Sequence, residues 1–286
     1  MQKMRSSGGR SAAQNTIILS GPSRSGKTLV NRLFDSHPKV INIYDEAYFW
    51  EHVYNYNEMG LESVLLDIFR RFTPAELVEG FKDRDILPWV DGKYIQTAIA
   101  QRQEQDLDFD PGIFLKGLEG LPACNSLLEV WECLVSTYAQ ASGRDYSTYD
   151  ATFIQAADHG KSILGGRRTL EQCKGIFLIR NPFYAIDSQK RSRELGNWRV
   201  LHPFNLGETI QRYRFFWENK DTIIDGQTLL VRFEDLLTDS ERTMRSVADY
   251  VGVPFNQGLL DPTLQGGSWG GLSAFTTTTG IDPSIL

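Results

Sequence analysis

Short apolar runs alternate with longer segments of helical periodicity along much of the chain. The apolar runs have the length of strands and cover residues 16–20, 40–44, 174–180 and 227–236. The longer segments place apolar residues three and four positions apart and cover residues 27–37, 183–195, 205–220 and 240–254. Such spacing is typical of amphipathic helices. Strands that alternate with helices predict a central parallel sheet covered on both faces, which is a three-layer α/β fold.

The stretch from about 60 to 160 has a different pattern, which is mainly helical. We interpret it as a large helical insertion or cap, where specificity for an acceptor would be expected. Residues 1–14 are basic and rich in small side chains, and we predict a loose tail there. The remaining residues, 15–286, are predicted to form a single domain that contains this insertion.

Composition limits the classes of function. The chain has 286 residues, of which 41% are hydrophobic, enough to bury a substantial core. The net charge of −6 disfavours nucleic acid as a partner. Three cysteines without a CxxC spacing suggest neither a disulfide framework nor a zinc site. Since no apolar run approaches the length that crosses a bilayer, we predict a cytoplasmic protein without a membrane span.

A phosphate-binding loop lies between the first predicted strand and the first predicted helix. Its sequence is Gly21-x-x-x-x-Gly26-Lys27-Thr28, a Walker A pattern. Backbone N–H groups of such a loop and the N-terminus of the following helix attract phosphate oxygens. The candidate donor-binding residues of the loop are Arg24, Ser25, Gly26, Lys27 and Thr28. The pattern predicts a phosphate-bearing ligand and leaves open which one.

A kinase or hydrolase that uses ATP and Mg²⁺ makes a further demand on the sequence. It needs an acidic residue at the end of another strand to hold the metal. The run at 174–180 ends in Arg180 instead, and Arg232 interrupts the run that leads to Glu234. A small-molecule kinase therefore remains an alternative whose metal requirement is poorly met. A nucleotide-binding module without chemistry is a second alternative.

Arg180 and Ser188 suggest a receptor for a terminal phosphate. A guanidinium at the end of a strand and a hydroxyl at the start of a helix suit a phosphate dianion. The segment FLIRNPFYAIDSQKR resembles the 3′-phosphate site of sulfotransferases that use 3′-phosphoadenosine 5′-phosphosulfate (PAPS). GPSRSGKT likewise resembles their 5′-phosphosulfate loop, and LLVRFEDLLTDSERTMRSVADYVGVPF their late strand and helix. The resemblance covers about 16–50 and 160–256 and is that of a divergent, bacterial-type member.

This resemblance implies a reaction and a donor. Sulfonate would move from PAPS to a hydroxyl or amine of a small-molecule acceptor, leave 3′-phosphoadenosine 5′-phosphate (PAP), and require no metal. The family usually has Thr or Ser where Lys27 stands, so the sequence carries an extra cation there. It also has Leu29 where cytosolic relatives have an aromatic residue, which leaves Trp217 as a candidate for stacking on adenine.

The chemistry needs a base that takes the proton of the acceptor. Glu46 is our first choice, because it follows the second strand at the edge expected to face the loop, where many sulfotransferases have a glutamate. Asp45 is the next choice, and His159 is the rival base. Lys27 is the candidate cation for the leaving group. The acidic residues around Glu46 favour a neutral or cationic small acceptor, and the oligomeric state stays open.

Overall fold

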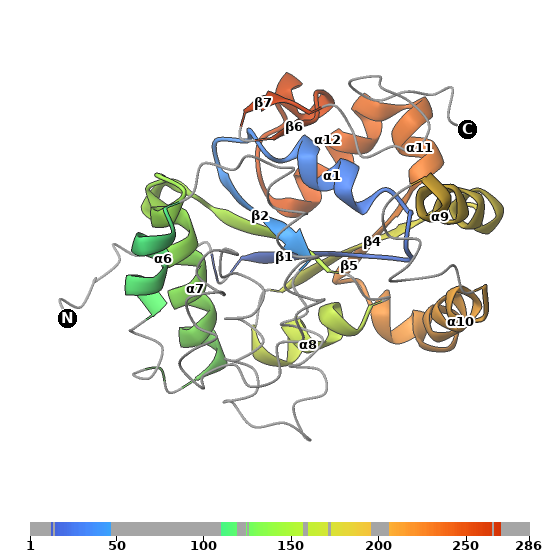
Figure 1. Ribbon diagram of the computed structural model, residues 1–286, viewed down its shortest axis with the longest axis horizontal. Coiled ribbons are helices and arrows are strands. Elements are labelled where there is room, and N and C mark those ends of the chain that lie inside the picture. The colour runs from blue at the N-terminus through green and yellow to red at the C-terminus, as the bar shows by residue number, and fades with distance from the viewer. Residues whose placement is uncertain are drawn as a thin grey trace.

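A five-stranded parallel sheet forms the centre of the molecule (Figure 1). The computed structural model describes residues 13, 15–46, 110–118, 124, 126–156, 160–170, 173–195, 206–264 and 266–269. The strands of the sheet are β1 (Thr16–Ser20), β2 (Val40–Glu46), β3 (Ala151–Gln155), β4 (Lys174–Ile179) and β5 (Thr228–Arg232). Their order is β2-β3-β1-β4-β5, and every neighbouring pair is parallel.

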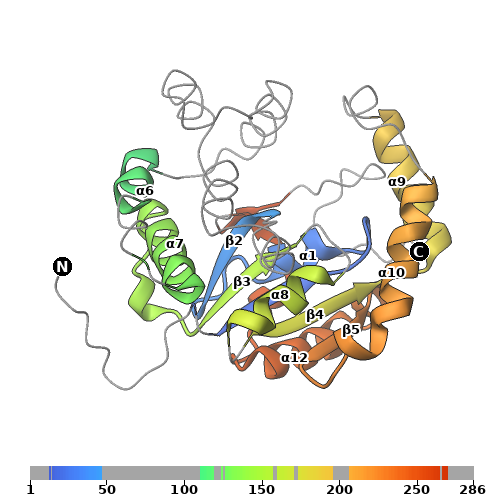
Figure 2. The same ribbon diagram turned by 90° about the horizontal axis from the view of Figure 1, so that it is seen from below.

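Helices cover both faces of this sheet (Figures 1 and 2). One face carries α1 (Lys27–Leu33), α11 (Phe233–Thr238) and α12 (Ser240–Val251), and the other carries α7 (Leu127–Ala141), α8 (Lys161–Thr169) and α10 (Leu206–Ile223). Ile17 and Leu19 of β1 pack toward the first group, whereas Ile18 packs toward the second. Because both faces are buried, β1 is apolar without alternation. The predicted three-layer α/β fold is confirmed.

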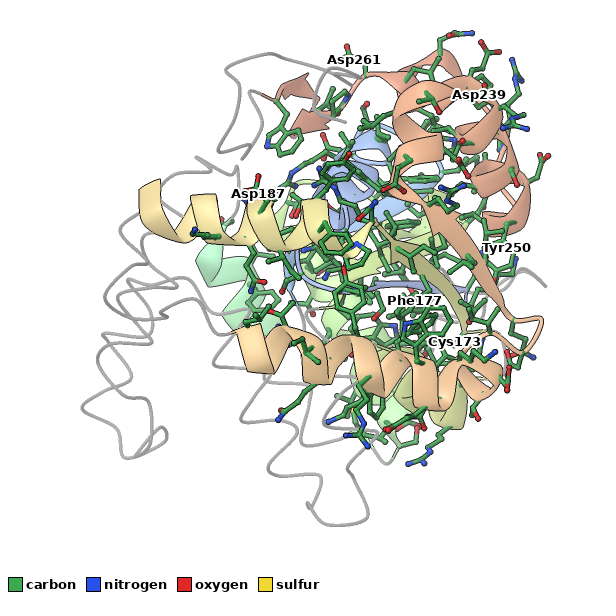
Figure 3. The ribbon with its side chains drawn as sticks, turned by 90° about the vertical axis from the view of Figure 1, so that its right-hand side faces the viewer. Cys173, Phe177, Asp187, Asp239, Tyr250 and Asp261 are labelled. Carbon is green, nitrogen blue, oxygen red and sulfur yellow. The ribbon has the colours of Figure 1, made fainter. Side chains whose placement is uncertain are left out.

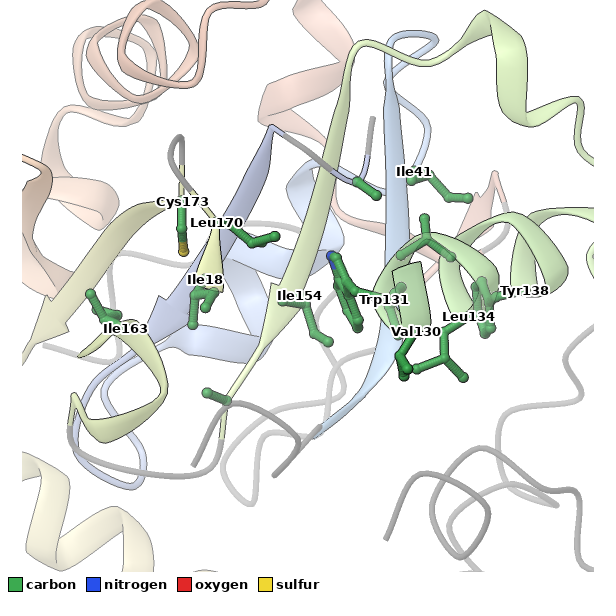
Figure 4. Close-up of a cluster of buried hydrophobic side chains, with 14 of the residues drawn as sticks. Ile18, Ile41, Val130, Trp131, Leu134, Tyr138, Ile154, Ile163, Leu170 and Cys173 are labelled. Atoms are coloured by element: carbon green, nitrogen blue, oxygen red, sulfur yellow. The ribbon is translucent and has the colours of Figure 1, made fainter. Parts of the chain in front are cut away.

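The second face owes part of its packing to Trp131 of α7. The ring is fully buried beside Ile154 of β3 (Figure 4). Its Nε1 donates a hydrogen bond of 2.8 Å to Thr16 Oγ1, and that hydroxyl donates one of 2.6 Å to the Ala13 carbonyl. The polar atom of a large buried ring is thereby satisfied, as burial requires. This contact fixes α7 to the start of β1.

The remaining elements lie at the edges of these layers. They are α6 (Pro111–Leu118), η4 (Tyr146–Thr148), α9 (Pro182–Leu195), η6 (Gln257–Leu260) and the antiparallel hairpin of β6 (Thr263–Leu264) and β7 (Gly267–Ser268). The buried Asp35, just after α1, accepts hydrogen bonds from Thr263 Oγ1 at 2.8 Å and Gly266 N at 2.9 Å. The hairpin is thus tied to the end of α1. Within the described part of the chain, no helix combines the length and apolarity that spanning a membrane would need.

The sequence prediction missed one strand and misjudged one boundary. β3 lies inside the stretch 60–160, which we expected to be mainly helical, yet it is a fully buried inner strand. Its five residues are too few to stand out beside a long helical pattern. Residues 233–236, expected to extend a strand, instead begin α11. The proposed insertion remains a prediction, since residues 47–109 lie outside the described residues.

A buried pair of amides joins α1 to β2. Asn31 Nδ2 donates to Asn42 Oδ1 at 2.8 Å, and Asn42 Nδ2 donates to the Asn31 carbonyl at 2.5 Å. Just beyond this Asn31–Asn42 clasp, the pairing of β2 with β3 shifts register between Ile43 and Glu46. Irregularities of this kind redirect the end of a strand and are common beside functional sites. The carboxyl end of β2 is therefore irregular and held against the helix that follows the loop.

Candidate functional site

The phosphate loop connects β1 to α1 and needs glycine at both ends. Gly21 has φ 145°, and an added Cβ would lie 2.3 Å from the Leu178 carbonyl oxygen of β4. Gly26 has φ 97°, and its added Cβ would lie 2.2 Å from the ring of Phe233. Only glycine fits such positive φ values and close approaches without strain. The loop is therefore packed directly against β4 and the start of α11.

Two side chains of the loop, those of Lys27 and Ser25, are buried. Lys27 is buried, and its Nζ donates hydrogen bonds to the carbonyls of Gly21 at 2.7 Å and Pro22 at 3.2 Å. Ser25 is fully buried, and its Oγ has no hydrogen-bond partner. A buried hydroxyl without a partner is unusual and calls for a missing acceptor. Thr28, in the first turn of α1, is half-buried.

The structure brings the predicted terminal-phosphate residues to the loop. Arg180 follows β4, and its Nη1 donates to the Arg24 carbonyl at 3.3 Å. Arg24 adopts φ 65°, and its Nε donates to Ser188 Oγ at 3.3 Å. We call Arg24, Arg180 and Ser188 the arginine–serine cluster. Residues separated by more than 150 positions in the sequence thus meet at the carboxyl edge of the sheet.

Phe233 and Glu234, the first two residues of α11, contact Arg180 and the start of α9. The guanidinium carbon of Arg180 lies 4.4 Å from the centroid of the Phe233 ring. Glu234 Oε1 accepts a hydrogen bond of 2.8 Å from the Asn181 amide at the start of α9. Burial lowers the pKa of Arg180, and the negative charge of Glu234 partly offsets that shift. An arginine so placed keeps its charge, since its ordinary pKa is far above neutral.

Glu234 and Asp235 follow the interrupted run that met the metal requirement poorly, and in the structure Glu234 accepts a hydrogen bond from the Asn181 amide. Among the residues that the structure describes, no group of three or more His, Cys, Asp or Glu side chains is arranged to hold a metal ion.

α10 contributes two residues that sequence reasoning missed. Arg212 Nη1 donates to Ser23 Oγ in the loop at 3.2 Å. The hydroxyl of Tyr213 is buried without a hydrogen-bond partner, and burial raises its pKa to about 12. Figure 3 faces the side of the molecule where α9, with Asp187, and α10 lie. Nothing in the helical periodicity of 205–220 marks these two residues, because the loop that Arg212 contacts lies far away in the sequence.

Two other predicted site residues, Trp217 and His159, have no described contact with the loop. Trp217, four residues after Tyr213 on α10, is 63% exposed, and its ring centroid lies 5.4 Å from that of Phe216. No contact in the structure tests whether it stacks on adenine. His159 lies outside the described residues. Lys161, which sequence analysis did not choose, begins α8, with its Nζ 5.6 Å from the Phe215 ring centroid.

Glu46 ends β2, and its backbone pairs with Gln155 of β3. Gln155 in turn pairs with Leu19 of β1, just before the loop. Glu46 is therefore two strand spacings, or about 10 Å, from the strand that carries the loop. The side chains of Asp45 and Glu46 lie outside what the structure describes, so the choice between them stays a prediction.

Comparisons with known proteins match part of the chain to one family model. A family model described as the sulfotransferase family matches residues 130–257, which include β3, the arginine–serine cluster apart from Arg24, and α10. The phosphate loop lies outside the matched segment, so its assignment rests on its own geometry. No curated protein sequence matches the chain.

Solved structures of three sulfotransferases share a limited likeness with the chain. The sulfotransferase domain of the Synechococcus PCC 7002 olefin synthase is 18% identical, with 94% of this chain and 84% of that chain covered and a TM-score of 0.48. The sulfotransferase domain from the curacin biosynthetic pathway is 17% identical, with coverages of 94% and 88% and a TM-score of 0.47. Sulfotransferase STF9 from Mycobacterium avium is 15% identical, with coverages of 86% and 65% and a TM-score of 0.43. At this level the likeness supports neither an acceptor nor the role of a residue. Over residues 130–257, which are a little under half of the chain, the protein is therefore similar to the sulfotransferase family.

Proposed function

We propose that this protein transfers sulfonate from PAPS to a hydroxyl or amine of a small-molecule acceptor. The observation that carries this proposal is the arginine–serine cluster beside the phosphate loop. PAPS has both a 5′-phosphosulfate and a 3′-phosphate, whereas ATP has no 3′-phosphate. A site with one cradle for each anionic end suits PAPS better than ATP.

Unpartnered polar atoms support the presence of an anionic ligand here. Three buried atoms around the loop have no hydrogen-bond partner, and they are Ser25 Oγ, Arg180 Nε and Tyr213 Oη. All three can donate a hydrogen bond, and phosphate and sulfonate oxygens only accept them. A buried donor left unsatisfied costs about 1–3 kcal/mol, so a bound anion would recover free energy at each. The residues present therefore fit PAPS.

The roles of the residues follow from where they lie. The loop amides and Lys27 would hold the 5′-phosphosulfate, and Arg24, Arg180 and Ser188 would hold the 3′-phosphate. PAPS supplies a sulfonate whose bond to the 5′-phosphate oxygen breaks as the acceptor atom bonds to sulfur. Negative charge would then grow on the 5′-phosphate, where the loop amides and the Lys27 ammonium would stabilise it.

Glu46 is the proposed base. It would take the proton of the acceptor hydroxyl or amine as the new bond to sulfur forms. Its support is the position at the carboxyl end of β2, after the register shift and about two strand spacings from β1. Asp45 and His159 are the alternatives. Acidic residues around this strand end favour a neutral or cationic acceptor.

Calorimetric titration of the purified protein tests the donor. PAP is expected to bind more tightly than adenosine 5′-phosphate (AMP), which lacks only the 3′-phosphate, and to bind equally well in EDTA. Arg180→Ala should weaken PAP by at least about tenfold and AMP much less. ATP that binds only with Mg²⁺, together with no preference for PAP over AMP, would support a kinase and overturn the proposal. Sulfation activity that is unchanged in Glu46→Gln would remove Glu46 as the base.

A further inference from the structure

Three arginines from separate segments gather around the phosphate loop. Arg24 belongs to the loop, Arg180 follows β4, and Arg212 lies on α10. The first two belong to the arginine–serine cluster. Arg212 was not expected at the site, yet its Nη1 lies 3.2 Å from Ser23 Oγ.

The contact with Ser23 places Arg212 beside the middle of the loop. Ser23 precedes Arg24, whose carbonyl accepts from Arg180 and whose Nε donates to Ser188. The Lys27 ammonium, by contrast, contacts the carbonyls of Gly21 and Pro22. Arg212 is therefore linked to the part of the loop that carries the arginine–serine cluster.

The residue after Arg212 gives independent support for this placement. The charge of Arg180 lowers the pKa of Tyr213, and Tyr213 raises the pKa of Arg180, as expected for two groups that lie close together. Tyr213 Oη and Arg180 Nε are also both buried and without a hydrogen-bond partner. Two unsatisfied polar atoms in one region indicate that a ligand group belongs between or beside them. This turn of α10 thus faces the same region as Arg180.

We propose that Arg212 is a third guanidinium that binds the 3′-phosphate of PAPS, together with Arg24 and Arg180. A phosphate monoester is mostly a dianion at neutral pH and has three acceptor oxygens. Several guanidinium forks can share these oxygens, since each fork offers parallel N–H donors. The assignment rests on the proposed function, because it concerns how that same donor site recognises PAPS.

The test compares Arg212→Gln with Arg214→Gln. Arg214 lies on the same helix two residues further on, is exposed, and pairs with Glu218 at 2.6 Å. Both changes remove one positive charge from α10, but only Arg212 contacts the loop. We expect Arg212→Gln to weaken PAP by at least about tenfold and AMP by less than about twofold. Arg214→Gln should change neither affinity.

Two further variants separate direct binding from an effect on the loop. Ser23→Ala removes the hydroxyl that Arg212 contacts, and we expect it to keep PAP affinity within about threefold of the wild type, because Arg212 keeps its charge and its N–H donors for the phosphate. Arg212→Lys keeps the charge without the planar fork and should restore only part of the affinity.

The outcomes distinguish the inference from the function on which it rests. If Arg212→Gln loses equal affinity for PAP and AMP, Arg212 only shapes the loop. The same follows if Ser23→Ala loses as much PAP affinity as Arg212→Gln. Equal losses in Arg212→Gln and Arg214→Gln would show a general charge effect. Each of these results overturns the inference and leaves the donor assignment standing. A wild-type protein that does not prefer PAP over AMP would overturn the proposed function itself.

Discussion

Gly26 joins the stability of the fold to the geometry of the donor site, and replacing it tests that connection. With φ 97°, alanine at this position would adopt a left-handed backbone conformation, which costs about 1–2 kcal/mol. The new Cβ would also lie 2.2 Å from Cδ2 and 2.6 Å from Cε2 of the buried Phe233 ring. Forcing such an atom into a packed core costs about 1–3 kcal/mol more. Gly26→Ala is therefore expected to lower the free energy of unfolding by about 2–5 kcal/mol.

Gly252→Ala is the matched control. Gly252 ends α12 with φ 88°, and its added Cβ would meet nothing closer than Lys174 Nζ at 3.9 Å. Only the backbone cost of about 1–2 kcal/mol applies there. Urea unfolding followed by circular dichroism measures both values from the midpoint and the slope.

The ring of Phe233 also contacts Arg180, whose guanidinium carbon lies 4.4 Å from the ring centroid. A cation–π contact of this kind is worth about 0.5–2 kcal/mol, so displacing the ring should weaken PAP by roughly two- to thirtyfold. Gly252→Ala should leave PAP affinity unchanged. In the double variant Gly26→Ala/Phe233→Val, the smaller side chain leaves space for the new Cβ. The loss of unfolding free energy should therefore be smaller than the sum of the losses in the two single variants. Equal destabilisation by the two glycine changes, or strict additivity in the double variant, would refute the steric argument.

Three other predictions concern buried polar groups. Tyr213→Phe removes a hydroxyl that has no partner, so calorimetry should show weaker PAP binding while the unliganded protein unfolds at the same or higher urea. A less stable protein with unchanged PAP affinity would contradict this. Thr263→Val removes a hydrogen bond to Asp35 and should cost about 1.5–3 kcal/mol in urea unfolding, against less than about 0.5 kcal/mol for Thr238→Val at the surface. Burial raises the pKa of Cys173 to about 12, so this thiol should resist Ellman's reagent at pH 8 until urea unfolds the protein. Prompt reaction of all three cysteines in the native protein would contradict that expectation.

The local parts of the fold were predictable because their signals are local. The run at 16–20 is apolar, ends at a glycine, and forms β1 with those bounds. Segment 240–254 has a clear helical period and contains α12. β3 escaped prediction, since a strand of five residues is recognisable mainly by its neighbours. Its place between β2 and β1 depends on pairing across more than a hundred residues, which no local pattern records.

The candidate site divides in the same way. The phosphate loop follows from a motif of eight residues, and Arg180 with Ser188 follows from a strand and the helix after it. The structure brings these two segments together, and their roles toward PAPS stay predictions. Arg212 had no such signal, because its contact in the loop is 189 positions away. A single sequence gives no indication of such long-range contacts between side chains.

The Asn31–Asn42 clasp has a consequence for how the sequence can vary. Each carboxamide satisfies groups of the other residue in a place closed to water, so replacing one asparagine alone leaves a buried amide without its partner. Such a loss costs about 1–3 kcal/mol, whereas exchanging both for an apolar pair can be nearly neutral. Positions 31 and 42 are therefore expected to change together among descendants of this sequence, as one inherited unit that spans the helix after the loop and the strand of the proposed base.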